Sequence, residues 1–257
     1  MTQMSPSRNL EILKRKARVA GLIAKETASV SHNCGVLAGT RFALEAVRGI
    51  LLERLGPARP RKSNVLDKQY GTDTAENVKL HGLDITSPNY QYAIYYRPTD
   101  FAILAQILDH LSIRHEDYTF IDYGSGKGLV LLRAAAYPFK KVIGVEFARE
   151  LHEIARRNLD CYPAHLRISE VELVNADALE FRPPTGNLVF YLYEPFEAPV
   201  TKKLIARIRE FWRGRDVLVA YVWSKNSRVS CRPLWDAVDF LAKVDEGDSW
   251  TVYRAAD

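Results

Sequence analysis

Short apolar runs recur through the second half of the chain, separated by longer stretches of mixed character. Within each run nearly every position is apolar, instead of every second one. This pattern is typical of strands that are buried on both faces of a parallel sheet. The five runs are TFIDYG (119–124), KVIGVEF (141–147), EVELVNAD (170–177), NLVFYLYEP (187–195) and DVLVAYVW (216–223).

Three of the stretches between the runs are long enough for helices: Lys127–Ala136, Arg149–Asp160 and Pro199–Trp212. Strands that alternate with helices predict a doubly wound α/β fold. The chain closes with two short strand candidates around Glu246-Gly247-Asp248, which predict a hairpin. We therefore expect a Rossmann-like, mostly parallel sheet of seven strands with an antiparallel C-terminal edge hairpin.

The first 62 residues follow a helical pattern instead. Apolar residues recur from Leu10 to Ala24 at spacings of three and four, and a second helix is expected from Thr40 to Leu55. Pro57–Asn64 has the prolines and charges of an exposed linker. We therefore expect a basic helical segment over residues 1–62 and a separate α/β domain over residues 63–257.

The positive charge of the chain belongs to that N-terminal segment. Residues 1–62 hold 12 Lys and Arg against 4 Asp and Glu, whereas the rest of the chain has a net charge of −3. A basic arm can bind RNA, an acidic protein or a membrane surface, but the solvated face of amphipathic helices is the favoured interpretation. Nucleic acid binding is therefore not favoured, and the oligomeric state is left open.

Cysteine use and hydropathy limit the cellular setting. The three cysteines are scattered, which argues against a disulfide framework or a zinc site and suits a reducing cytoplasm. No apolar run reaches the roughly 18 residues of a membrane span, and the N-terminus lacks a signal-peptide pattern. We expect a cytoplasmic protein with no metal ligands.

A glycine loop follows the first apolar run, with glycines at 124, 126 and 128. A nucleoside triphosphate loop needs Ser or Thr directly after its lysine, whereas Lys127 is followed by Gly128. A dinucleotide loop needs G-x-G-x-x-G, and Leu129 stands where the third glycine belongs. The loop therefore disfavours a triphosphate, and leaves an NAD-dependent oxidoreductase as an outside alternative.

Acidic residues at three successive strand ends favour a different ligand. Asp122 lies near the end of the first run, Glu146 lies near the end of the second, and Asp177 is the last residue of the third. The carboxylate of Glu146 can accept hydrogen bonds from both vicinal hydroxyls of a ribose, and that of Asp177 can accept one from an adenine amino group. Asp122 would repel a pyrophosphate but attract a sulfonium or ammonium group. These residues favour an adenosyl cofactor without phosphate.

The ordered set of motifs resembles the class I, seven-β-strand methyltransferases that use S-adenosylmethionine. FIDYGSGKG resembles their motif I, VIGVEF the strand that ends in the ribose-binding acid, NADA (175–178) the adenine-contacting motif and LVFYLYEPF (188–196) motif IV. The resemblance spans about Tyr92 to Ala255 and implies S-adenosylmethionine as the cofactor. The cofactor-binding residues that we expect are Tyr96, Asp122, Gly124, Ser125, Gly126, Gly128, Glu146, Asp177, Ala178 and Glu194.

The methyl acceptor is expected beside motif IV. Many N-methylating relatives have Asn or Asp, then Pro-Pro and an aromatic residue, where this chain has Glu194-Pro195-Phe196. Glu194 is the expected catalytic residue, since a carboxylate can accept a hydrogen bond or a proton from an amine; capping the following helix is the structural alternative. Tyr95, Pro195 and Phe196 are the expected substrate contacts.

Upstream of the loop, YYRPTD (95–100) resembles a Pro-Thr segment that covers the cofactor in a set of protein lysine methyltransferases. The resemblance implies that Tyr96 and Thr99 line the pocket, although Thr99 is favoured as the N-cap of a helix over Asp100–Leu111. Lys127 is expected to point to solvent or toward a carboxylate of the cofactor. A protein lysine is our first choice of acceptor. A small-molecule O- or N-methyltransferase and a non-catalytic cofactor-binding module remain alternatives.

Overall fold

The computed structural model describes residues 63–256 except 81, 82, 213, 225, 226, 228 and 229, together with six isolated positions in the first 62 residues. The chain divides into two units, Met1–Lys62 with His81–Asp84, and Ser63–Leu80 with Ile85–Asp257. The helices predicted for residues 1–62 lie outside the described residues. The rest of this section concerns the second unit.

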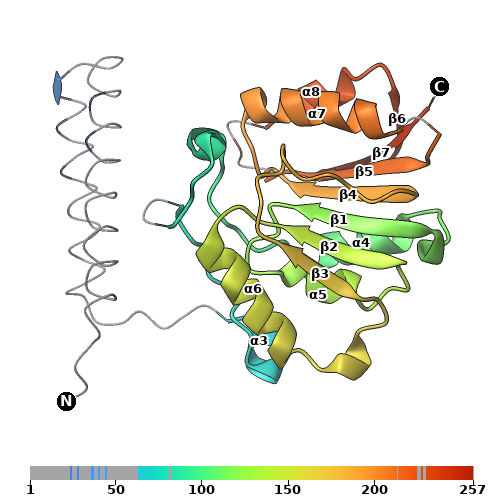
Figure 1. The fold of residues 1–257 in the computed structure, drawn as a ribbon, viewed down its shortest axis with the longest axis horizontal. Coiled ribbons are helices and arrows are strands. Elements are labelled where there is room, and N and C mark those ends of the chain that lie inside the picture. The colour runs from blue at the N-terminus through green and yellow to red at the C-terminus, as the bar shows by residue number, and fades with distance from the viewer. Residues whose placement is uncertain are drawn as a thin grey trace. The chain divides into compact units, whose positions relative to one another are not determined.

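The second unit is built on one seven-stranded sheet in the order β3-β2-β1-β4-β5-β7-β6 (Figure 1). Strands β1 to β5 pair in parallel, and β7 pairs antiparallel with both β5 and β6. The predicted α/β sheet with an antiparallel C-terminal hairpin is confirmed. The strands are β1 (Tyr118–Tyr123), β2 (Lys141–Val145), β3 (Val171–Val174), β4 (Asn187–Tyr193), β5 (Val217–Val222), β6 (Leu241–Gly247) and β7 (Trp250–Ala255).

Successive strand residues face two separate apolar cores. Phe120 of β1 packs with one cluster and Ile121 with the other, and Val189 and Phe190 of β4 divide in the same way. The first cluster includes α4 and α5, and the second includes α7 and α8. Because both faces of the central strands are covered, these strands are apolar at nearly every position.

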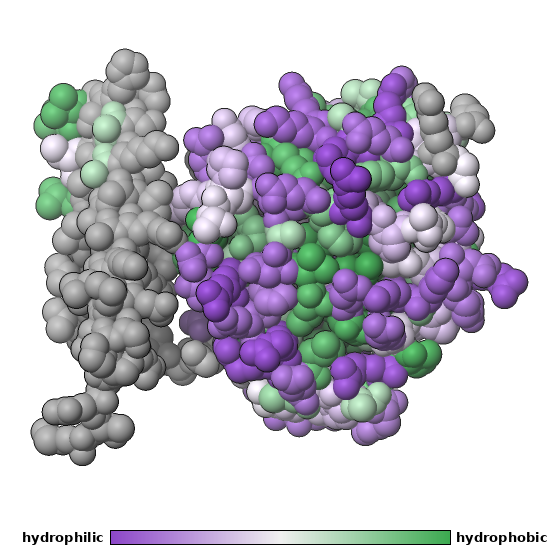
Figure 2. Space-filling view, in the orientation of Figure 1, coloured by the Kyte–Doolittle hydropathy of each residue, from purple (hydrophilic) through white to green (hydrophobic). Residues whose placement is uncertain are grey.

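The helices lie close to the predicted stretches. The described helices are α3 (Val65–Tyr70), α4 (Phe101–His110), α5 (Leu129–Ala134), α6 (Arg149–Cys161), α7 (Ala198–Trp212) and α8 (Arg232–Asp236), with short 3-10 turns η1 (Pro88–Tyr92), η2 (His115–Asp117) and η3 (Ala164–Leu166). Hydrophilic residues cover most of the visible face of this unit, with hydrophobic residues showing between them (Figure 2). No described helix is both long and apolar enough to cross a membrane.

One predicted helix cap is wrong. The side chain of Asp100, not Thr99, accepts the hydrogen bond from the Ala102 N–H at 2.8 Å and caps α4. Thr99 is buried one residue earlier, where its Oγ1 accepts a hydrogen bond from the Tyr191 hydroxyl at 3.3 Å. Asp is at least as good an N-cap residue as Thr. Asp100 therefore caps the helix, and the Thr99 side chain can be buried in the core.

Candidate active site

A pocket lies at the carboxyl ends of β1, β2 and β4, where the strand order reverses between β1 and β4. Open α/β sheets bind ligands at such a reversal because the flanking loops diverge there. The pocket has about 850 Å³ of empty space including its open mouth, within the roughly 300–1,000 Å³ of small-molecule sites. Predicted residues in its lining are Tyr95, Tyr96, Thr99, Asp122, Gly124, Ser125, Glu146, Asp177, Ala178, Glu194, Pro195 and Phe196.

The glycine loop has a steric requirement for each of its three glycines. All three have φ between +53° and +82°, a region that side chains rarely adopt. A Cβ on Gly126 would lie 2.1 Å from Cδ2 of Tyr96, and one on Gly124 would lie 2.8 Å from Cβ of Pro195. Gly126 and Gly128 do not appear in the pocket lining, so their direct contact with a cofactor stays a prediction. The structure gives both a packing role.

The carboxylate of Glu146 fastens the loop to the end of β2. Its Oε2 accepts the Gly126 N–H and its Oε1 accepts the Ala148 N–H, each at 2.8 Å. Burial raises the pKa of Glu146 from 4.5 to about 7, although both of these backbone donors lower it. Burial, followed by repulsion from Glu146, raises the pKa of Asp122 well above 3.8. Two buried carboxyl groups therefore face one pocket, as expected for a site that takes a cationic or hydroxyl-rich ligand.

Asp177 is held by an upstream segment that the sequence did not connect to it. Its Oδ2 accepts hydrogen bonds from the Ser87 hydroxyl and, at 2.8 Å, from the Asn89 amide. Its Oδ1 accepts the Leu179 N–H at 2.8 Å. Asn89 also lines the pocket. These contacts place η1 beside the predicted adenine end of the site.

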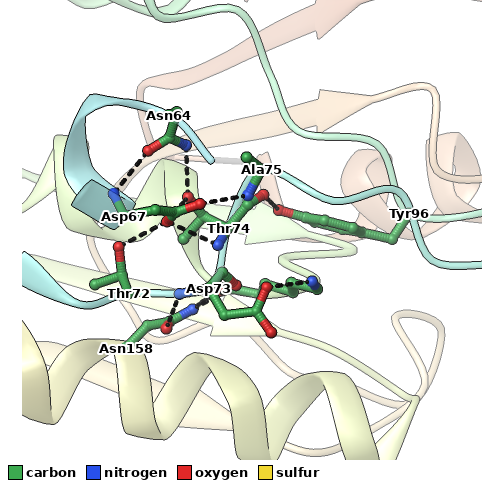
Figure 3. Close-up of polar contacts among 9 residues, drawn as sticks. Asn64, Asp67, Thr72, Asp73, Thr74, Ala75, Tyr96 and Asn158 are labelled. Atoms are coloured by element: carbon green, nitrogen blue, oxygen red, sulfur yellow. Dashed lines mark hydrogen bonds and ion pairs between the residues drawn. The ribbon is translucent and has the colours of Figure 1, made fainter. Parts of the chain in front are cut away.

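Tyr96 covers the glycine loop and is anchored on the far side. Its hydroxyl donates to the Thr74 carbonyl at 2.8 Å (Figure 3). The carboxylate of Asp67 accepts hydrogen bonds from the backbone of Thr74 and Ala75 and from the hydroxyls of Thr72 and Thr74, at 2.8–3.0 Å. Hydrogen bonds to Asp67 therefore hold the turn after α3 in shape, and the Thr74 carbonyl of this turn holds the Tyr96 hydroxyl.

The expectation for Lys127 is wrong. Its side chain is 2% exposed, and its Nζ donates to Oδ1 of Asp73 at 2.7 Å. The side chain of Asn158 in α6 forms hydrogen bonds with the backbone N–H and carbonyl of Asp73 (Figure 3). Its amide also donates to the carbonyl of Lys127. The turn that carries Asp73 packs on the loop and shields Lys127 from solvent.

Glu194 follows β4 with φ +41°, a conformation that is rare for a residue with a side chain. Its Oε2 accepts a hydrogen bond from Nη2 of Arg97 at 3.2 Å and from the Ser224 N–H at 3.1 Å. Its Oε1 is buried and has no hydrogen-bond partner among the described residues. The carboxylate does not cap α7, so the capping alternative is wrong, and one oxygen of this pocket-lining residue remains unpaired among the described residues.

The segment before the loop and the segment after β4 join across the mouth of the pocket. The Ile94 N–H donates to the Pro195 carbonyl at 3.0 Å, and the Glu197 N–H donates to the Tyr92 carbonyl at 2.8 Å. Tyr95, beside this junction, is 45% exposed. The predicted substrate contacts are therefore brought to one rim, where an acceptor can enter.

The buried polar atoms of the pocket fit the predicted cofactor. Ser125 and Glu194 both line the pocket, and each has one buried side-chain oxygen, Ser125 Oγ and Glu194 Oε1, without a partner among the described residues. An unpaired buried polar group is costly, so such atoms mark places where a ligand completes the hydrogen bonding. S-adenosylmethionine carries amino and hydroxyl groups that can do so, and it adds no phosphate to the buried carboxylates.

Sequence reasoning missed Arg97, Ser87, Asn89 and Asp73. Arg97 stands within the YYRPTD motif, and a lone basic residue directly after two tyrosines was the available signal. Its partner Glu194 lies 97 positions along the chain. No periodicity in the sequence joins such distant residues.

Comparison with known proteins gives a consistent assignment. Residues 89–179 match the family model "Histone methylation protein DOT1". Over 209 residues the chain is 29% identical to a Drosophila melanogaster protein, "Histone-lysine N-methyltransferase, H3 lysine-79 specific". That alignment covers 76% of this chain but only 11% of the relative.

Solved methyltransferase structures are also similar. An RNA methyltransferase from Salinibacter ruber in complex with S-adenosyl-L-homocysteine is 25% identical, with a TM-score of 0.43, 62% of this chain covered and 92% of that chain. A putative methylase from Haemophilus influenzae is 17% identical, with a TM-score of 0.48, 71% of this chain covered and 100% of that chain. The assignment rests on the sheet, the motifs and the DOT1 match. The predicted resemblance to the class I, seven-β-strand methyltransferases and the prediction of S-adenosylmethionine as the cofactor are confirmed by the DOT1 family match and the histone-lysine methyltransferase relative.

Proposed function

We propose that this chain transfers a methyl group from S-adenosylmethionine to the ε-amino group of a lysine in a protein. The observation that carries the proposal is the DOT1 match over residues 89–179. The matched stretch contains the glycine loop, Glu146 and Asp177, and it begins at Asn89 in the pocket wall. The Drosophila relative, named for a histone lysine, supports a protein acceptor.

The geometry around Glu194 supports an amine acceptor. S-adenosylmethionine supplies an activated methyl group on sulfur, and an amine must approach that methyl group in line with a free lone pair. The unpartnered Oε1 of Glu194 can accept an N–H of the entering amine and so orient the lone pair away from the carboxylate. After transfer the same oxygen can hold the proton that the amine loses.

The walls of the pocket mouth support a long, flexible side chain as substrate. Tyr95, Tyr193 and Phe196 contribute aromatic surface to the lining. An aliphatic stem packs well on such surface, while its polar tip reaches a buried oxygen. A lysine has this combination of stem and tip.

Transfer of label from methyl-labelled S-adenosylmethionine tests the proposal. The full chain is incubated with recombinant histone H3 in one reaction and with total cell extract in another, and the products are separated by size. We expect label in the protein fraction. Label confined to small molecules would replace the proposal by a small-molecule methyltransferase. Cofactor binding without any labelled product would indicate a non-catalytic binding module.

The proposal includes a cytoplasmic location. Among the described residues, Cys161 and Cys231 are both free thiols, which is in keeping with a reducing compartment such as the cytoplasm. Fractionation of cells that express the tagged chain checks this, and a secreted or membrane-bound product would contradict it.

A further inference from the structure

Arg97 is the one Lys or Arg among the described residues that line the pocket. Its guanidinium lies over the rings of Tyr95 and Tyr193, 5.2 Å from each centroid. It also forms an ion pair with Glu194 at 3.2 Å, and the two side chains are 19% and 0% exposed. A planar guanidinium held by two rings and a carboxylate has little freedom to move.

The contacts of Glu194 are uneven between its two oxygens. Arg97 and the Ser224 N–H both donate to Oε2, which leaves Oε1 without a partner among the described residues. Glu194 also keeps φ at +41°, a strained conformation for a residue with a side chain that persists only where the surrounding contacts hold it. The two donors on Oε2 therefore hold the carboxylate of this pocket-lining residue in one orientation and leave Oε1 as its unpaired oxygen.

The charge of Arg97 has a separate consequence for an amine acceptor. A lone buried carboxylate attracts an ammonium group and stabilises its protonated form. A protonated lysine has no lone pair and cannot accept a methyl group. Because Arg97 balances the charge of Glu194, the pair can accept an N–H without holding the amine as an ammonium ion.

We propose that Arg97 is a positioning residue that fixes Glu194 through Oε2 and makes Oε1 a hydrogen-bond acceptor for a neutral amine. This proposal rests on the proposed amine methylation. In this role Arg97 favours the deprotonated form of the acceptor amine. It acts through Glu194 and does not contact the reacting atoms.

Two variants, one without the positive charge and one that keeps it, test the proposal. Arg97→Gln retains an N–H donor but removes the cation, and Arg97→Lys retains the cation. In Arg97→Gln we expect the rising limb of kcat against pH, measured with saturating histone H3 so that it reports the bound amine, to move up by about one unit. The rate below the limb then falls by about tenfold. Arg97→Lys should keep the wild-type position of the limb.

A binding measurement makes the test independent of turnover. With S-adenosylhomocysteine saturating, calorimetric titration of n-butylamine at pH 7 reports attraction of an ammonium ion. Arg97→Gln should bind it at least several-fold more tightly than the wild type and Arg97→Lys should not. Arg133→Met is the matched control, because Arg133 also stacks on a ring, that of Phe101 at 5.6 Å, but does not line the pocket.

S-adenosylhomocysteine affinity within about twofold of the wild type shows that a variant is folded. Should Arg97→Gln not bind it, Arg97→Met takes its place, since its stem still packs between the rings. An unmoved pH profile, or unmoved n-butylamine affinity, in the uncharged variant overturns the role of Arg97. Absence of label on any protein, in histone H3 and in cell extract alike, counts against the proposed function instead, and the amine titration still decides for or against Arg97.

Discussion

The ion pair between Lys127 and Asp73 gives a sharp test of how the glycine loop is stabilised. The lysine side chain is 2% exposed and the aspartate 30% exposed, with 2.7 Å between Nζ and Oδ1. Removal of one partner from a fully buried pair costs about 3–5 kcal/mol, and exposed pairs contribute about 0–1 kcal/mol. For Asp73→Asn, which leaves a buried ammonium beside a neutral amide, we expect a loss of about 2 kcal/mol in the free energy of unfolding.

The two partners should respond unequally. In Lys127→Met the aspartate left behind is partly exposed and can be hydrated, so we expect a loss below about 1 kcal/mol. The double variant should match Lys127→Met, because no buried charge remains. The coupling free energy from this double-mutant cycle then measures the interaction between Lys127 and Asp73.

Urea unfolding followed by tryptophan fluorescence measures these differences. All four tryptophans lie beyond residue 62, so the signal reports on the α/β unit alone. The reasoning would be refuted if Asp73→Asn had the same free energy of unfolding as the wild type. It would also be refuted if Lys127→Met lost more of this free energy than Asp73→Asn.

Three further predictions concern the pocket. Gly126→Ala should weaken S-adenosylhomocysteine binding at least tenfold by calorimetry, because its Cβ would lie 2.1 Å from Tyr96; Gly214→Ala, with φ +72° but no atom within 4 Å, is the control that should bind normally. Because burial raises the pKa of Glu146 from 4.5 to about 7, its ionisation costs folding free energy as pH rises through that window. Glu146→Ala should therefore be less destabilising at pH 8 than at pH 5, by up to about 3 kcal/mol in urea unfolding; equal effects at both pH values would contradict this. Glu194→Gln, measured by initial rates, should lower kcat by about 10²-fold or more with little change in cofactor affinity, and undiminished kcat would remove its role.

Much of the fold was predictable because the central strands are buried on both faces. The apolar runs at β1, β2, β4 and β5 follow from that burial, and the strand ends then placed Asp122, Glu146 and Asp177 at one edge of the sheet. These residues could be found because a parallel sheet brings consecutive strand ends together.

The contacts that complete the site depend on chain segments far apart in sequence. Asp73 reaches Lys127 across 54 positions and Arg97 reaches Glu194 across 97. Neither contact follows the spacing of a strand or a helix, so sequence reasoning expected Lys127 to face solvent or the cofactor and assigned no role to Arg97. Charges of this kind acquire partners only through tertiary packing.

Identification of the methylated atom tests the central claim most directly. The full chain is incubated with methyl-labelled S-adenosylmethionine and the protein acceptor, and the labelled peptides are sequenced by tandem mass spectrometry. We predict that the label is on the ε-nitrogen of lysine and that Glu194→Gln strongly reduces it. Label on an oxygen, on a nucleic acid or only on a small molecule would contradict the assignment of a protein lysine as the acceptor.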